Sequence, residues 1–231
     1  MPDDLPLFPL GHAVLFPGMP LSLHVFEERY RELVRTLVRQ EEDGRRFGVV
    51  AIRQGWEVGA DAVKALHPVG CAAEVRRVSR YPDGRFDLVT VGTRRFRLAG
   101  VDDGSRPYLV GSVEWLPPDP PDDATGRRLT LSVASLFGEY VAAAGALRED
   151  GAEVGTEIGA ELPADPSALS YLVASTAVLT LDDRQTLLEA DTAAERLRAE
   201  LRMLKRETTM VRRLRALPVP VAELQVTQSL S

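Results

Sequence analysis

Cysteine and histidine are scarce in this sequence, and each shortage excludes a class of site. Cys71 is the only cysteine among 231 residues, so the chain can form no internal disulfide and no zinc site built from several thiolates. The three histidines, His12, His24 and His67, are far apart and show no metal-ligand spacing. We therefore expect no metal and no cofactor. Cys71 is expected to be a small buried core residue, because it lies within an apolar run.

Catalytic signatures and long apolar runs are also missing. Neither of the two lysines, Lys64 and Lys205, belongs to a Gly-x-x-x-x-Gly-Lys-Ser/Thr phosphate loop, and no Gly-x-Ser-x-Gly or His-Glu-x-x-His sequence occurs. No catalytic residue is predicted, although an enzyme whose site is assembled from distant residues stays open as an alternative. No apolar run of about 18 residues is present to span a membrane, and residues 1–4 begin no signal peptide. A cytoplasmic location is the default expectation.

What the chain does contain is an ordinary globular composition, with 45% hydrophobic and 27% charged residues. Its length is sufficient for one large domain or two small ones with a substantial core. The formal net charge of −6 disfavours general affinity for nucleic acid, which requires a positive field.

Proline shapes the first twenty residues. Pro6, Pro9, Pro17 and Pro20 prevent a helix there, so the apolar residues between them are expected in strands or loops, with an edge or bulged strand around Pro6 and Pro9. From Tyr30 onward the apolar residues follow a helical period, which predicts one helix near residues 27–40.

Short extended runs separated by turn residues predict a β subdomain over residues 1–116. Strands are expected at residues 46–52, 69–80, 86–91, 94–98 and 108–116, with a break at Gly92-Thr93, a loop at residues 54–67 and a hairpin turn at Pro82-Asp83-Gly84. About seven short strands with frequent turns are typical of a twisted β-barrel or sandwich.

The second half of the chain has helical signals. Residues 117–126 are rich in proline and aspartate and predict a stiff hinge, followed by a helical subdomain at 127–217 and a flexible tail at 218–231. Helix starts are indicated at Asp165-Pro166, at Thr180 and at the Thr192-Ala193-Ala194-Glu195 capping box, and a glycine-rich loop at 145–164. The fold class expected is therefore α+β, a β subdomain followed by a helical bundle.

The last helix, expected at residues 192–215, is basic. Its apolar spine, Leu197, Leu201, Leu204 and Val211, has the four-three spacing of a coiled-coil seam. We favour packing of this seam within the bundle over dimerisation, so a monomer or weak dimer is expected.

Several motifs, in order, resemble the N-terminal substrate-binding domain family of Lon proteases and, more distantly, the Lon-like domain of cereblon. They include Leu-Pro-Leu-Phe-Pro-Leu at residues 5–10, Leu-His-Val-Phe at 23–26, Tyr-Pro-Asp-Gly-Arg at 81–85 and Leu-Asp-Asp-Arg-Gln-Thr-Leu-Leu-Glu at 181–189. The resemblance covers roughly residues 5–217. It implies a PUA-like β subdomain with a helical subdomain, in a stand-alone form without ATPase or peptidase domains. It also implies a non-catalytic module that recognises unfolded or partly unfolded polypeptide, as an adaptor or chaperone-like binder, with a separate protease or chaperone as a further partner.

The predicted substrate-binding side chains are Phe16, Met19 and Leu21. They lie in or beside a proline-rigid loop that Gly18 is expected to leave exposed, and an accessible apolar patch suits unfolded chains. Burial of the same residues in the core is the alternative.

A second alternative is an RNA-binding PUA-like module whose basic face includes Arg95 and Arg97. Strand alternation predicts that these two side chains point outward together, and we favour a merely solvated strand face over a nucleic-acid site. His24 lies in an apolar strand, and we favour a structural histidine over a ligand there.

Overall fold

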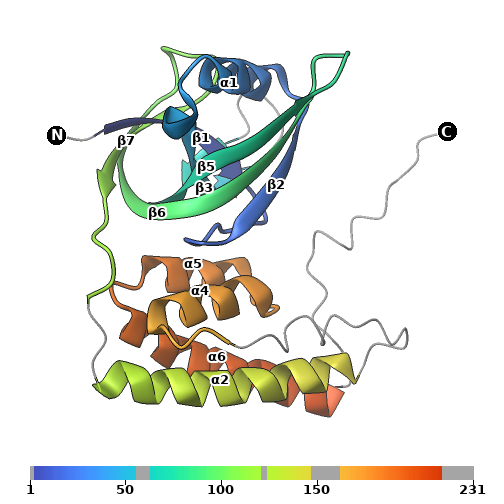
Figure 1. The fold of residues 1–231 in the computed structure, drawn as a ribbon, viewed down its shortest axis with the longest axis vertical. Coiled ribbons are helices and arrows are strands. Elements are labelled where there is room, and N and C mark those ends of the chain that lie inside the picture. Colours follow the sequence, from blue (N-terminus) through green and yellow to red (C-terminus); the bar gives the residue numbers. More distant parts are fainter. Residues whose placement is uncertain (1–2, 56–62, 121–123, 147–161, 215–231) are drawn as a thin grey trace. The chain divides into compact units, whose positions relative to one another are not determined.

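The structure is a computed structural model that describes residues 3–55, 63–120, 124–146 and 162–214 (Figure 1). The chain divides into two compact units, Met1–Pro118 and Asp119–Ser231. Among the described residues, the first unit carries the strands and the second carries helices alone, so the predicted α+β class is confirmed. The predicted tail at 218–231 and most of the predicted loop at 145–164 lie outside the described residues.

The β unit is built on a sheet of seven strands, in which five close into a ring. Along the ring β1 pairs with β7, β7 with β6, β6 with β5, β5 with β3, and β3 returns to β1, while β2 adds to β6 and β4 to β3. The elements are β1 (Asp3–Leu10), β2 (Pro20–Val25), α1 (Glu28–Val38), η1 (Glu42–Gly44), β3 (Arg46–Gly55), β4 (Val63–Leu66), β5 (Val69–Arg80), β6 (Phe86–Asp102) and β7 (Val110–Trp115).

The two prolines of β1 are accommodated because this strand changes partner halfway. Asp3–Pro6 pairs antiparallel with β7, and Leu7–Leu10 pairs parallel with β3. Each half therefore has one recorded neighbouring strand, and a proline without an N–H is tolerated where only one side of the strand needs donors.

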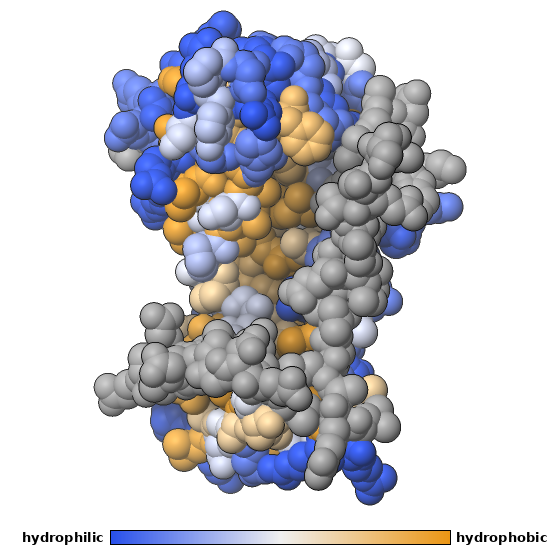
Figure 2. All heavy atoms as spheres, turned by 90° about the vertical axis from the view of Figure 1, so that its right-hand side faces the viewer, coloured by the Kyte–Doolittle hydropathy of each residue, from blue (hydrophilic) through white to orange (hydrophobic). Residues whose placement is uncertain are grey.

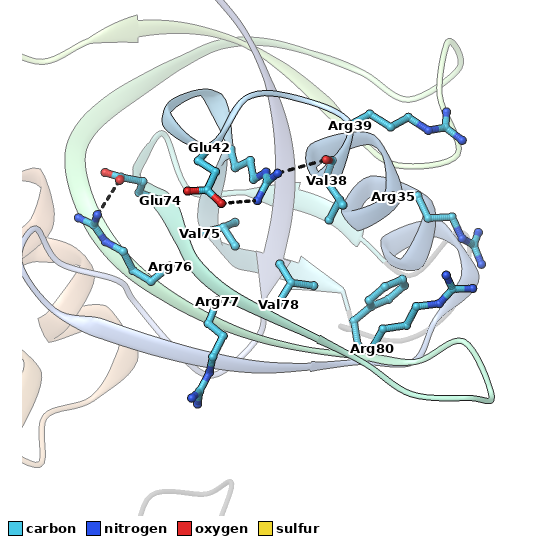
Figure 3. A pocket seen from close by; sticks show the side chains of 12 residues that line it. Arg35, Val38, Arg39, Glu42, Glu74, Val75, Arg76, Arg77, Val78 and Arg80 are labelled. Atoms are coloured by element: carbon cyan, nitrogen blue, oxygen red, sulfur yellow. Dashed lines mark hydrogen bonds and ion pairs between the residues drawn. The ribbon is translucent and has the colours of Figure 1, made fainter.

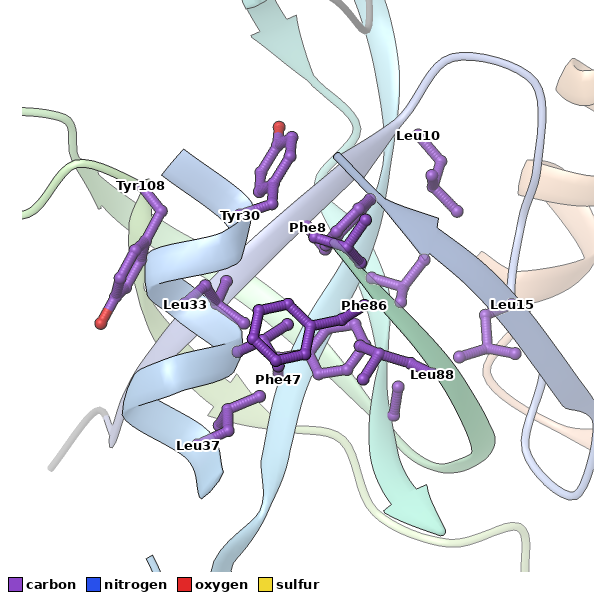
Figure 4. Close-up of a cluster of buried hydrophobic side chains, with 14 of the residues drawn as sticks. Phe8, Leu10, Leu15, Tyr30, Leu33, Leu37, Phe47, Phe86, Leu88 and Tyr108 are labelled. Carbon is purple, nitrogen blue, oxygen red and sulfur yellow. The ribbon is translucent and has the colours of Figure 1, made fainter. Parts of the chain in front are cut away.

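Helix α1 covers one opening of the barrel. Its buried residues are Tyr30, Leu33, Val34 and Leu37, which is the face that the helical period predicts. The ring of Tyr30 stacks on Phe8 of β1 at 4.2 Å, and Figure 4 shows Leu33, Leu37 and Phe47 converging in the same cluster. The N-terminal strand and the helix that follows it therefore share one core.

Two strands differ from the sequence-based expectation. Strand β4 (Val63–Leu66) forms inside the predicted loop at residues 54–67, and β6 continues through Gly92-Thr93, where a break was predicted. Gly92 is needed there for packing: its N–H donates to the carbonyl of Met19, and a Cβ at this position would lie 2.2 Å from the carbonyl oxygen of Phe16. The glycine allows the β1–β2 loop to lie directly against the strand.

The helical unit begins each of its later helices at a predicted cap. The side chain of Asp165 accepts a hydrogen bond from the N–H of Ala168 at 2.7 Å. In the same way, the hydroxyl of Thr180 accepts from the N–H of Asp183 at 3.1 Å, and the hydroxyl of Thr192 accepts from the N–H of Glu195 at 3.2 Å. The elements are α2 (Ala124–Gly145), α4 (Pro166–Thr176), α5 (Leu181–Glu189) and α6 (Ala193–Leu214).

Helix α6 packs along α2 and also contacts α4 and α5 (Figure 1). Leu197, Leu204 and Val211 of its predicted spine are buried, so this seam serves the core of the unit. None of the described helices combines the length and the hydrophobicity needed to cross a bilayer.

Candidate functional site

A groove lies between the C-terminal end of α1 and the outer half of β5. Its volume is about 840 Å³, and six arginines line it: Arg35, Arg39, Arg45, Arg76, Arg77 and Arg80. The two acidic residues of its lining are Glu42 and Glu74, so positive side chains exceed negative ones by four. In a chain whose net charge is −6, this arginine groove is a local reversal of charge.

The apolar floor of the arginine groove depends on a bulge in β5. Val75 pairs with Thr90 of β6, but Arg77 pairs with the very next residue, Val89, so β5 contains one extra residue there. As a result Val75 and Val78, three positions apart, both pack against the barrel core beside Phe86. Figure 3 shows the two valines between the arginines of β5 and those of α1.

Half of the groove's arginines already have carboxylate partners. Arg35 binds Glu28 and Glu32, Arg45 lies 3.6 Å from Glu42, and Arg76 lies 2.8 Å from Glu74. The contacts with Glu28 and Glu32 raise the pKa of Arg35, chiefly through its hydrogen bond to Glu28.

The structure records no ion pair for Arg39, Arg77 or Arg80 within the described part of the chain. Figure 3 shows Arg39 and Arg80 extending toward the same end of the groove as Arg35, whereas Arg77 extends in a different direction from these three. Charge is therefore available to an anionic ligand at one end of the arginine groove.

The prediction that Phe16 is an accessible side chain of an apolar binding site is wrong. This side chain has 0% of its surface exposed, because the loop turns back at Gly18, whose φ of 79° suits glycine, and the turn places Phe16 inside. The N–H of Met19 donates to the carbonyl of Phe16 and closes that turn. Met19 and Leu21 are half-buried against the core, so their contact with a ligand stays a prediction.

The prediction that Arg95 and Arg97 both point outward is wrong for Arg95. Arg95 is buried, with 4% of its surface exposed, while Arg97 is exposed. Alternation predicts the side of a strand but not the depth of packing, and Arg95 lies opposite the buried Cys71. The two arginines do not form one open basic face.

His24 is exposed and its ring nitrogens have hydrogen-bonding partners, so its structural role stays a prediction. Its Nδ1 lies 2.7 Å from Asp87, whose other oxygen accepts a hydrogen bond from the hydroxyl of Tyr81 at 2.5 Å. The bond from Tyr81 is the main cause that lowers the pKa of Asp87, and the same bond raises the pKa of Tyr81. A hollow of about 140 Å³ lies beside His24 and the exposed Phe26, too small for more than a side chain or two.

The thiol of Cys71 lies in the barrel core, as expected from the sequence. Burial raises its pKa to about 12, so the nucleophilic thiolate is absent near neutral pH. Among the described residues, no group of three or more His, Cys, Asp and Glu side chains is arranged to hold a metal ion.

Comparison with known proteins defines the class to which this arrangement belongs. Residues 4–206 match the family described as the ATP-dependent protease La (LON) substrate-binding domain, and the chain belongs to this family. The resemblance noted in the sequence is therefore confirmed.

Curated relatives include Lon protease 1 of Thermus thermophilus, 29% identical over 206 residues, which cover 88% of this chain and 25% of that protein. Lon protease 2 of Syntrophobacter fumaroxidans is 30% identical over 190 residues, 82% of this chain and 22% of the relative. The chain thus spans about a quarter of the length of the curated relatives it matches.

Two solved structures share the fold. The Lon N-terminal domain protein of Xanthomonas campestris is 28% identical, with a TM-score of 0.59 over 87% of this chain and 98% of that one. The N-terminal domain of the Mycobacterium avium complex Lon protease has a TM-score of 0.62 at 20% identity, over 88% of this chain and 98% of that one, a likeness of fold alone.

Proposed function

We propose that this protein is a non-catalytic module that recognises polypeptide and acts as an adaptor or chaperone-like binder of unfolded segments. The observation that carries the proposal is the match of residues 4–206 to a family described as a substrate-binding domain. A separate protease or chaperone would then act on the bound chain.

Three features of the β unit support a binding role. The single thiol is buried and protonated, which removes it as a nucleophile. The arginine groove offers charged and apolar contacts side by side over a volume that suits a peptide segment. The β unit is the upper unit in Figure 2. On the face shown there, hydrophobic residues gather over part of this unit, while hydrophilic residues cover its upper end.

The test is binding of a fluorescently labelled, reduced and denatured model protein, followed by anisotropy, with the same protein in its native state as the control. We expect weak binding of the denatured form only. Met19→Ser and Leu21→Ser should weaken it if these side chains contact the ligand, whereas Val101→Ser, which changes an exposed apolar residue of β6, should not.

Two results would overturn the proposal. The first is tight binding of an unstructured RNA that collapses with added salt, together with no binding of polypeptide, which would favour the RNA-binding alternative. The second is hydrolysis of ATP or peptide by the purified chain that a point substitution in this chain abolishes.

A further inference from the structure

We infer that the arginine groove binds an extended acidic polypeptide segment, which adds as a further strand to the outer edge of β5. The inference rests on the proposed function and gives it a location and a class of ligand. It follows from the pairing of β5, from the floor of the groove and from its charge.

The outer half of β5 is an open strand edge. Cys71–Glu74 is flanked by β3 and β6, and the N–H of Val75 still donates to the carbonyl of Arg45 at 2.9 Å. Beyond that point, the only strand recorded beside Arg77–Arg80 in the described part of the chain is β6. Every second residue of such a strand directs its N–H and C=O away from its single partner, which is the template used in β-strand addition.

The groove beside this edge provides what an added strand needs on its inner face. Val75, Val78 and Phe86 form an apolar floor, and Val38 of α1 faces it with 42% of its surface exposed. Side chains of an extended segment alternate between faces, so one set would contact this floor and the other set would project outward. Small apolar residues at alternate positions suit such a floor.

The positive charge of the groove favours a segment with acidic side chains. The arginines of the groove exceed its glutamates by four, and Arg39 and Arg80 have no recorded ion pair among the described residues. Guanidinium groups bind carboxylates through paired, charge-assisted hydrogen bonds. Glutamate or aspartate at the positions near Arg39 and Arg80 would use this excess, whereas lysine there would be repelled.

An RNA strand fits the same groove less well. Single-stranded nucleic acid is held by aromatic rings on which bases stack, as well as by positive charge. The only ring among the described lining residues belongs to Phe86, which is 5% exposed and faces the core. The backbone donors and acceptors of the β5 edge match another peptide backbone, and this favours polypeptide.

The experiment compares fluorescein-labelled ten-residue peptides that alternate valine with glutamate, glutamine or lysine. We expect the glutamate peptide to bind about tenfold more tightly than the glutamine peptide, because hydrogen bonds to charged groups exceed neutral ones by that order. The lysine peptide should bind most weakly, because the arginines repel it. Added salt should weaken the binding of the glutamate peptide. N-methylation of every second backbone amide can modify either the valine amides or the glutamate amides. One of these two sets faces β5, so methylation of that set should abolish binding, and methylation of the other set should not.

The matched variants are Arg39→Ser with Arg80→Ser, and Arg97→Ser as the control. Arg97 is an exposed residue of β6 outside the lining of the groove, so its loss changes net charge without changing the site. The double variant should lose about tenfold in affinity for the glutamate peptide, and Arg97→Ser should lose much less. All three residues are exposed, and equal melting temperatures would verify that the variants fold.

The outcomes separate the inference from the function beneath it. If denatured protein binds but the glutamate peptide shows no preference, or if Arg97→Ser weakens binding as much as the double variant, the inference is wrong while the proposed function stands. Strong competition by single-stranded RNA, with no effect of N-methylation, would also overturn it. If neither the denatured protein nor any peptide binds, the proposed function fails together with the inference.

Discussion

Asp119 accepts a hydrogen bond from Arg196, which follows it by 77 residues, and the two side chains are exposed by only 7% and 0%. The same guanidinium donates to the hydroxyl of Ser170 at 2.8 Å and lies 4.1 Å from the centre of the Tyr171 ring. Asp119 belongs to the segment predicted as a stiff hinge at residues 117–126. This ion pair fixes it to α6 within the helical unit.

Arg196→Met should therefore destabilise the helical unit strongly. Removing one partner leaves a buried carboxylate without its cation, which typically costs about 3–5 kcal/mol. Urea unfolding followed by circular dichroism measures the loss, and Arg198→Met, on the exposed face of the same helix, is the matched control. The double variant Arg196→Met with Asp119→Leu should recover part of the loss, and a cycle with no recovery would contradict a specific pair.

Glu200 predicts a dependence of stability on pH. Burial is the main cause that raises its pKa well above the usual 4.5, and the nearby Arg196 lowers it by less. The folded chain therefore keeps this proton to higher pH than the unfolded chain does. Stability linked to this group is intact below about pH 4.5 and is lost as the pH rises from there toward the folded pKa.

Glu200→Gln removes that dependence. The variant should match the wild type near pH 4 and become progressively more stable than it at higher pH, measured by urea unfolding across the range. Glu195→Gln, an exposed change on the same helix, should show no such trend. An equal difference between Glu200→Gln and wild type at every pH would contradict a raised pKa.

Cys71 should be inert in the native protein. Its thiol is fully buried with a pKa of about 12, so a thiol reagent should label it only after unfolding. Mass spectrometry after timed exposure to iodoacetamide, with and without guanidinium chloride, provides the comparison. Labelling of the native protein at the rate of the unfolded chain would show that the barrel opens on that timescale.

Two glycines should respond to alanine in opposite directions. At Gly92 a Cβ would meet the carbonyl oxygen of Phe16 at 2.2 Å, so Gly92→Ala should destabilise the β unit by about 1–3 kcal/mol. At Gly138, inside α2, a Cβ would meet nothing within 4 Å. Gly138→Ala should stabilise by about 0.5–1 kcal/mol, because alanine is the better helix former. Equal effects at the two positions would contradict the crowding at Gly92.

Local patterns in the sequence predict the helices well because the causes are local. The period that begins at Tyr30 gives α1 its buried face, and Asp165, Thr180 and Thr192 begin their helices as caps. β4 was missed because Val63–Leu66 owes its strand to pairing with β3, which no local pattern shows.

The site was harder to predict than the fold. A loop with Gly18 predicts an exposed Phe16, but this side chain is buried, and the β1–β2 loop lies against Gly92, a residue distant in sequence. The arginine groove was missed for a similar reason. Arg35 and Arg39 are four residues apart on a helix, and Arg76, Arg77 and Arg80 cluster on a strand, a signal that was present. Only the tertiary structure brings the two groups to one groove.

The pairing of β1 with β7 has a consequence for how the protein is made. Asp3 lies opposite Val113 and accepts a hydrogen bond from the indole of Trp115 at 2.6 Å. The first half of β1 therefore pairs only once β7, the last strand of the barrel along the chain, has left the ribosome, and Leu5 lacks this neighbour until then. Closure over so long a stretch of chain is slow compared with local helix formation. The nascent β unit is then itself an unfolded polypeptide, of the kind this protein is proposed to bind.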